Sequence, residues 1–219
     1  MEGRATATKY VEDWQQVYQH KEQPLIDLFS KRHGKLFLDV GAHAGRWVIP
    51  LASVFDKVVA FEPNPYSAQV LLENVEKMGL SNVSIWNVGV TDIPGMKTLS
   101  ELDGTPSRST IYPAFSSLPV TREFWAYFLR LDEYFKEASL LTVDTEGSDP
   151  EVLRGAKGIL QRGTRLCVET HSDRLYEECA GFLRGIGLKF ETVTLPDEAP
   201  ESLHARNGRK HKYIVRTDE

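Results

Sequence analysis

The sequence predicts an α/β protein: a doubly wound, mostly parallel seven-stranded sheet with helices on both faces and a C-terminal antiparallel hairpin. Short apolar segments alternate with helical patterns along the chain, which is typical of parallel βαβ units. The apolar segments are nearly continuous, which fits a sheet that is covered on both faces. The last two, Lys189–Thr194 and Lys212–Arg216, have no helical pattern between them, so we expect them to pair antiparallel.

Five further strands precede that hairpin in the chain. We expect them at Lys35–Val40, Lys57–Phe61, Val83–Val88, Leu140–Asp144 and Arg165–Glu169.

Helical patterns separate most of these strands. Residues 45–55 predict a helix with Pro50 near its start, where proline is tolerated. Asn64 and Pro65 supply an N-cap and a first-turn proline for the next helix. The apolar stripe of that helix comprises Ala68, Leu71, Leu72, Val75 and Met78.

Two more helices are predicted in the second half of the chain. Ser148 and Glu151 have the spacing of a capping box before a helix that ends at Gly163. Ser172 caps the second helix, which ends at Gly187.

The length and charge narrow the class of protein. A chain of 219 residues suits one domain, 1–219, with an N-terminal helical lid (1–34), an insertion (92–139) and the terminal hairpin (188–219). The net charge of −5 argues against a protein that coats duplex DNA or an anionic membrane. The insertion is too long for one connection, and its stretch 124–134 is compatible with strand or helix.

The sequence also favours a cytoplasmic location. The longest nearly apolar run, Trp47–Phe55, is half the length of a membrane span, and residues 1–15 contain no signal-peptide core. The two cysteines, Cys167 and Cys179, have no metal-ligand spacing, so we expect reduced, buried thiols.

The most informative segment is the glycine turn of residues 39–47, which follows the first strand. Ligands of open α/β sheets bind beyond the carboxyl ends of the strands, where a glycine lets the backbone approach the ligand. Glu62 ends the second strand about 20 residues after Gly41, the spacing that places an acid on two ribose hydroxyls.

The turn fits S-adenosylmethionine (SAM) better than a dinucleotide. A pyrophosphate needs a second glycine, but His43 occupies that position. SAM instead carries an ammonium, which suits Asp39, and a carboxylate, which suits the backbone amides of the turn. We expect the cofactor site to comprise Asp39, Gly41, Ala42, His43, Gly45, Trp47 and Glu62, with Pro63, Asn64, Asn87 and Val88 around the adenine.

A second motif, T-V-D-T-E-G-S-D-P-E-V-L-R-G-A over residues 142–156, follows the fourth strand. Together with FLDVGAHAG (37–45), AFEPNP (60–65), RLDEYF (130–135) and CVETH (167–171), it closely resembles the FkbM family of methyltransferases. The resemblance implies a Rossmann-like methyltransferase fold, SAM as cofactor with S-adenosylhomocysteine (SAH) as product, and O-methylation of a hydroxyl on a small molecule. Many relatives belong to sugar and polysaccharide pathways, which implies a glycan or glycosylated acceptor.

The sequence departs from that family at two positions. The family usually has asparagine where this chain has His43. It usually has lysine two residues before the D-x-E-G aspartate, where this chain has Thr142.

Three residues at the carboxyl ends of neighbouring strands are candidate catalytic groups. Asp144 is the first candidate, as general base or substrate anchor, followed by His171 and then Glu146, which would brace the loop. Positioning of the nucleophile supplies up to ~7–11 kcal/mol and a base only ~3–5, so positioning is the larger contribution. Asp144, Glu146, Glu169 and His171 would suit Mg²⁺, but we assign no metal site.

Three other functions compete with O-methylation. A nucleic-acid (RNA) methyltransferase is supported by the basic loop Pro196–His211 alone and opposed by the net charge. A non-catalytic SAM-binding module would fit the missing family lysine at Thr142. An NAD-dependent reductase is disfavoured by His43 in the turn and by the terminal hairpin.

Overall fold

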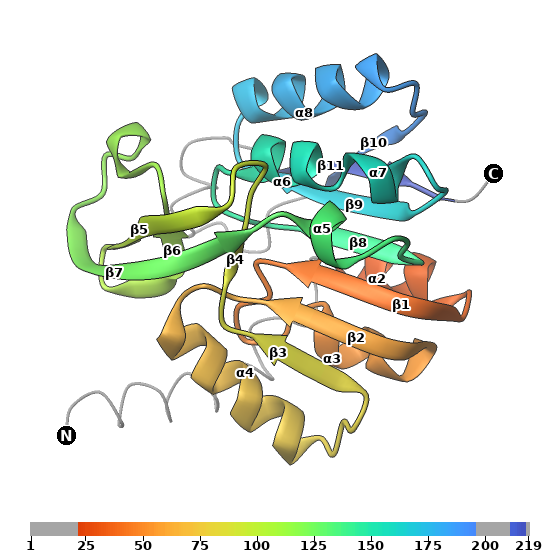
Figure 1. Cartoon of the computed structure of the whole chain (residues 1–219), viewed down its shortest axis with the longest axis horizontal. Coiled ribbons are helices and arrows are strands. Elements are labelled where there is room, and N and C mark those ends of the chain that lie inside the picture. Colours follow the sequence, from red (N-terminus) through yellow and green to blue (C-terminus); the bar gives the residue numbers. More distant parts are fainter. Residues whose placement is uncertain (1–21, 196–210, 218–219) are drawn as a thin grey trace.

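The computed structural model describes residues 22–195 and 211–217, and these residues form two β-sheets. The larger sheet has seven strands in the order β10-β11-β9-β8-β1-β2-β3 (Figure 1). Its strands are β1 (Gly34–Val40), β2 (Phe55–Phe61), β3 (Val83–Trp86), β8 (Leu140–Val143), β9 (Arg165–Thr170), β10 (Glu191–Leu195) and β11 (His211–Arg216). All pairs are parallel except those of β11, which runs antiparallel to β10 and β9. The predicted fold class and terminal hairpin are confirmed.

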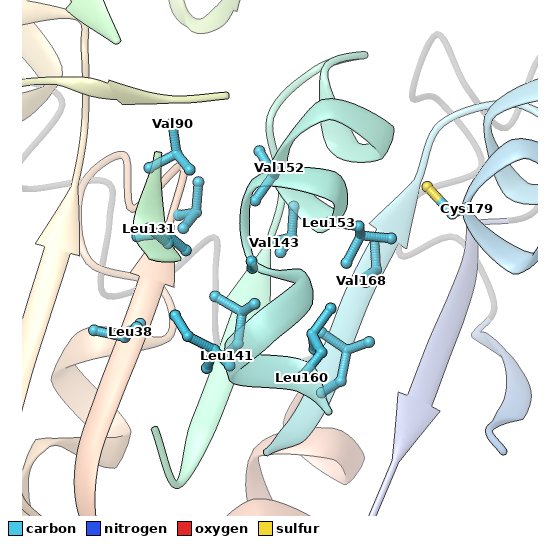
Figure 2. Packing of buried hydrophobic residues seen from close by; sticks show 14 of the residues in the cluster. Leu38, Val90, Leu131, Leu141, Val143, Val152, Leu153, Leu160, Val168 and Cys179 are labelled. Atoms are coloured by element: carbon cyan, nitrogen blue, oxygen red, sulfur yellow. The ribbon is translucent and has the colours of Figure 1, made fainter. Parts of the chain in front are cut away.

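Apolar side chains fill both faces of this sheet. On one face Leu38, Val143 and Val168 pack against α6 (Asp149–Gly155), α7 (Lys157–Leu160) and α8 (Asp173–Gly185), as Figure 2 shows. On the other face Phe37 and Val58 pack against α2 (Gln23–Ser30), α3 (Val48–Leu51) and α4 (Pro65–Lys77). Because successive strand residues point to opposite faces, neighbours such as Phe37 and Leu38 serve different layers.

The helix after the glycine turn is shorter than the sequence predicts. Instead of covering residues 45–55, it spans α3 and a 3₁₀ turn, Ala52–Val54, and β2 already begins at Phe55. Gly45 has a φ of +101°, which an α-helix does not accommodate, so the helix starts only after it. Pro50 therefore lies in the first turn, where its missing N–H costs nothing.

The single helix predicted after Ser148 is two helices, α6 and α7. Ser148 makes no side-chain cap hydrogen bond, so the capping box is absent. Gly155 packs so closely on the backbone of Thr91 that an added Cβ would lie 2.3 Å from its carbonyl oxygen. The break follows at Ala156, and two amides of the first turn of α7, those of Gly158 and Ile159, donate to the carboxylate of Asp132 at 2.8 and 3.1 Å.

The other two predicted caps are present. Asn64 accepts the amide of Tyr66 at 2.9 Å, and Ser172 accepts that of Leu175 at 3.2 Å. However, Leu72 in α4 and Met78, its C-cap, are exposed, so they do not belong to the buried stripe.

The insertion and the two residues of β4 just before it form a second sheet of four strands, in the order β4-β7-β5-β6. They are β4 (Gly89–Val90), β5 (Gly95–Leu102), β6 (Thr105–Thr110) and β7 (Val120–Leu129), and the short helix α5 (Leu131–Tyr134) follows. Residues 124–134 are thus strand first and helix afterwards. Figure 1 shows this sheet beyond the carboxyl ends of β1, β2 and β8, where ligands of open α/β sheets bind.

The remaining predictions concern the chain ends and the thiols. Residues 1–21 of the predicted N-terminal lid, and 196–210 of the basic loop, lie outside the described residues. The described part of the lid, α2, buries Leu25, Ile26 and Phe29 in the core. Cys167 and Cys179 are both free and buried, as predicted. Among the described helices, none is long and apolar enough to cross a bilayer.

Candidate cofactor and methyl-transfer site

The glycine turn lies against the loop that follows β8. Gly41 has a φ of +83°, and a Cβ added there would lie 1.8 Å from the carbonyl oxygen of Asp144. The amides of Gly41 and Ala42 both donate to the carbonyl of Phe61 in β2, at 3.0 and 3.1 Å. Only glycine combines this backbone conformation with this approach. The two sequence motifs, around residues 41 and 144, therefore form one site.

Asp39 presents a buried carboxylate oxygen to this turn. Its side chain is 2% exposed, and Oδ1 accepts a hydrogen bond of 2.5 Å from Thr142, its register partner on β8. Oδ2 has no hydrogen-bond partner among the described residues. Burial raises the pKa of Asp39 to about 7, against the opposing effect of the Thr142 hydrogen bond. Such an oxygen needs a donor, and a positively charged one suits it best.

Glu62 braces the turn as well as ending β2. Its two oxygens accept the amides of His43 and Asn64, both at 2.8 Å. Burial raises the pKa of Glu62 to about 7, although both hydrogen bonds oppose the rise. His43, in the left-handed region with a φ of +46°, is neutral because burial and the Arg46 charge lower its pKa to about 4. A carboxylate oxygen has two lone-pair sites, so Glu62 retains acceptor capacity for ribose hydroxyls.

The residues predicted around the adenine take different positions. Asn87 is exposed and holds the carbonyls of Glu62 and Pro63, at 2.7 and 3.2 Å. Asn64 is fully buried and turns its amide toward the second sheet, while Val88 packs against the core. Trp47, predicted in the cofactor set, is 5% exposed and packs on Phe29 in the core.

Asp144 and His171 come together at the carboxyl ends of β8 and β9. The His171 Nε2 lies 2.8 Å from the Asp144 Oδ1, and both side chains are partly exposed. Burial alone lowers the pKa of His171, but the Glu146 charge and the Asp144 hydrogen bond raise it well above its ordinary value. These interactions favour the protonated form of His171, which holds the Asp144 carboxylate in place.

Glu146 completes this group from the same loop as Asp144. It has a φ of +53°, and burial raises the pKa of its carboxyl against the effect of His171. Asp144, Glu146 and His171 each offer a ligand atom within 4.8 Å of the others. The fourth residue considered for Mg²⁺, Glu169, lies instead 3.8 Å from Arg46.

Two sets of buried polar contacts around the site could not be predicted from the sequence. Asp149 in α6 accepts both the amide and the hydroxyl of Thr145, at 3.0 and 2.6 Å, and so fixes the loop after β8. Arg46 at the turn pairs with Glu22 at 2.8 Å, and Glu22 accepts the hydroxyl of Tyr213 at 2.8 Å. The second contact joins residues 191 positions apart, so no local pattern could reveal it.

The sequence profile of the Methyltransferase FkbM domain matches residues 39–210. The chain belongs to the FkbM methyltransferase family. No curated protein matches the sequence of this FkbM domain.

Solved structures share the fold of this FkbM domain at low sequence identity. A methyltransferase FkbM from Methylobacillus flagellatus KT has a TM-score of 0.60 at 14% identity over 84% of this chain. This chain spans 44% of that protein. A precorrin-8w decarboxylase from Methanobacterium thermoautotrophicum has a TM-score of 0.57 at 17% identity, covering 89% of each chain. A methyltransferase candidate from Streptococcus mutans, solved with SAH, has a TM-score of 0.52 at 15% identity, covering 90% and 98%.

SAM is the cofactor that follows from the FkbM family, and the residues present fit it. The buried, unpartnered oxygen of Asp39 suits an ammonium, and Glu62 keeps acceptor capacity for a ribose. When bound, SAM supplies an electrophilic methyl group on a sulfonium, which leaves a neutral thioether after transfer.

Proposed function

We propose that this FkbM domain catalyses O-methylation of a hydroxyl group on a small metabolite, with sugar-containing molecules as the acceptor class. The observation that carries the proposal is the Asp144–His171 pair, 2.8 Å apart, beside the glycine turn. The hydroxyl proton becomes strongly acidic as its oxygen gains a methyl group. A carboxylate is therefore a sufficient proton acceptor in a late transition state.

The roles of the two residues follow from their contact. His171 holds one oxygen of Asp144, and the other Asp144 oxygen accepts the hydroxyl proton of the acceptor molecule. This hydrogen bond also directs a lone pair of the hydroxyl oxygen toward the methyl group. With SAM bound, the methyl–sulfur bond would break as the oxygen–methyl bond forms, and Asp144 would receive the hydroxyl proton. Positioning of this kind supplies up to ~7–11 kcal/mol, more than the base itself.

The charge of the site favours a neutral acceptor. Burial, and to a smaller extent the charge of Asp144, raises the pKa of Glu146 and of Asp149, so the fold favours the neutral form of both acids near the pair. A phosphorylated acceptor or an RNA backbone would bring negative charge into this partly buried group of acids, where charge is poorly solvated and weakly screened. This supports an uncharged polyol or glycoside over the RNA alternative.

A methyl-transfer assay with matched variants tests the proposal. Purified protein is offered SAM with neutral sugars and glycosides, sugar phosphates and RNA, and SAH release is measured. Asp144→Asn should lower the rate with the best acceptor by about 10²–10⁴-fold at unchanged SAH affinity. His171→Gln, which preserves a hydrogen bond without the charge, should lose less.

Two outcomes would contradict the proposal. Transfer to RNA with none to hydroxylated small molecules would favour the nucleic-acid alternative. Tight SAH binding with no transfer to any acceptor would favour the non-catalytic module.

A further inference from the structure

Strand β6 touches both halves of the site. At Ser109 its hydroxyl oxygen accepts a hydrogen bond of 2.8 Å from the side-chain amide of Asn64, in the loop after β2. One residue later, the Thr110 Oγ1 would lie 4.0 Å from a Cβ added to Gly147, so the strand approaches the loop that carries Glu146. Beyond the strand, the Tyr112 hydroxyl donates to Glu151 at 2.8 Å. The strand therefore spans from the cofactor loop to the catalytic loop.

Asn64 is the junction at the cofactor end of this span. It is fully buried, and its backbone amide donates to the carboxylate of Glu62 at 2.8 Å. Its Oδ1 caps α4, and its Nδ2 faces three acceptors of the second sheet: Ser109 at 2.8 Å, Glu101 at 3.4 Å and the Pro106 carbonyl at 3.5 Å. Every polar group of its side chain is thus used inside the protein, which leaves none for the adenine.

A continuous chain of hydrogen bonds therefore joins Glu62 to β6. The carboxylate that receives the ribose also holds the amide of Asn64, and the Asn64 side chain holds Ser109. A ligand that fixes Glu62 consequently restrains Asn64, and through it the strand. Buried hydrogen-bonded groups transmit such restraint because leaving any member unpaired is costly.

We propose that Asn64 is a positioning residue that couples cofactor binding at Glu62 to the placement of β6, the strand that forms the acceptor-side wall. That β6 faces an acceptor rests on the proposed function, whereas the coupling itself needs only the cofactor. Occupancy of the cofactor site then orders the wall before the acceptor arrives.

Hydrogen–deuterium exchange of the full chain, with and without SAH, tests the coupling. In the wild type, SAH should slow exchange of the amides of residues 105–112 by about fivefold, the effect of one retained hydrogen bond. In Asn64→Asp the cap of α4 survives, but the donor to Ser109 is lost and a second carboxylate faces Glu101. The SAH-dependent slowing in residues 105–112 should disappear, while SAH still binds and slows exchange in the glycine turn.

Two further variants separate coupling from general loosening. Thr121→Val removes hydrogen bonds to Gly104 and Glu101 within the same sheet and leaves the Asn64–Ser109 contact intact. It should keep the SAH-dependent slowing. Adding Glu101→Gln to Asn64→Asp supplies a new amide donor opposite the introduced carboxylate and should restore the slowing in part.

The outcomes are distinct. Equal slowing in wild type and Asn64→Asp, or SAH binding to the wild type without slowing in residues 105–112, would overturn the coupling alone. Failure of the wild type to bind SAH would overturn the coupling together with the cofactor assignment. A wild type that shows the slowing but methylates no hydroxyl would leave the coupling standing and count against the proposed function.

Discussion

Gly41 is the residue at which two motifs more than 100 positions apart meet. Its left-handed backbone and its contact with the Asp144 carbonyl each exclude a side chain. Two residues earlier on each strand, Asp39 and Thr142 meet in the same way. The cofactor turn and the catalytic loop are thus parts of one packed unit, and a substitution in either segment should displace the other.

Gly41→Ala should therefore destabilise the protein by about 3 kcal/mol or more, from left-handed strain plus overpacking. It should also abolish SAH binding, because the Asp144 loop must move. Gly79→Ala is the matched control: its φ is +64°, but nothing lies within 4 Å of the added Cβ. It should cost only about 1–2 kcal/mol. Urea unfolding and calorimetric titration measure both, and equal costs at the two sites would contradict the close contact.

The pH dependence of SAH binding reports on Asp39. Its pKa of about 7 in the free protein falls when an ammonium pairs with the ionised carboxylate. Binding therefore strengthens as pH rises, and the affinity should increase roughly tenfold between about pH 6 and about pH 8. Titration in buffers of different ionisation enthalpy should show proton release. Asp39→Asn should bind more weakly with a flatter profile, and an unchanged slope in this variant would rule out Asp39 as the titrating group.

Among single residues, the sequence identifies those whose chemistry is set by their place after a strand. Asp39, Gly41 and Glu62 lie at the turn, and Asp144 and His171 meet. Asn64 and Asn87 lie near Glu62, but their side chains serve the protein itself. Their partners come from other elements, and which side-chain hydrogen bond forms depends on packing that no local pattern encodes.

At the scale of elements, the break between α6 and α7 shows how tertiary contacts divide a helical pattern. The apolar spacing continues across Ala156, yet Gly155 packs on the Thr91 backbone and Asp132 caps the next turn. In the R-L-D-E-Y-F motif of residues 130–135, the aspartate therefore accepts the amides of α7. Periodicity alone cannot show this, because the cap comes from a distant segment.

Asp132→Ala should lower the free energy of unfolding by about 1–2 kcal/mol, since it leaves two amides of α7 without their acceptor. Denaturant unfolding measures the change. Glu133→Ala is the control, because the neighbouring Glu133 side chain accepts no such hydrogen bond from the described residues. It should change the free energy of unfolding by less than about 0.5 kcal/mol. Equal effects of the two variants would refute the capping role.

The whole molecule gathers buried carboxyl groups on the cofactor side of one sheet. Burial is the largest cause of the raised pKa of Asp39, Glu62 and Asp149, each to about 7. A raised pKa means that the fold favours the protonated form. The stability these groups contribute is present below their ordinary pKa near 4 and is lost as pH rises through about 7. The raised pKa of His171 acts in the same direction.

The ligand-free protein should therefore lose about 1–3 kcal/mol of stability between about pH 5.5 and about pH 8. Bound SAM or SAH should reduce this loss, because its ammonium favours the ionised Asp39. Thermal unfolding across this range, with and without SAH, measures both effects. A melting temperature that rises with pH in the ligand-free protein would contradict the burial of these acids.

The parallel sheet, the terminal hairpin and the strand ends that carry Asp39, Glu62, Asp144 and His171 could all be predicted from the sequence. These follow from periodicity, glycine positions and the alternation of strands and helices, which are local and additive. The tertiary structure alone decided the second sheet, the break at Ala156, the Thr142–Asp39 contact and the span of β6 from Asn64 to Gly147. Each of these joins residues distant in sequence, and its free energy depends on desolvation and on the pairing of buried polar groups, which exist only once the chain has packed.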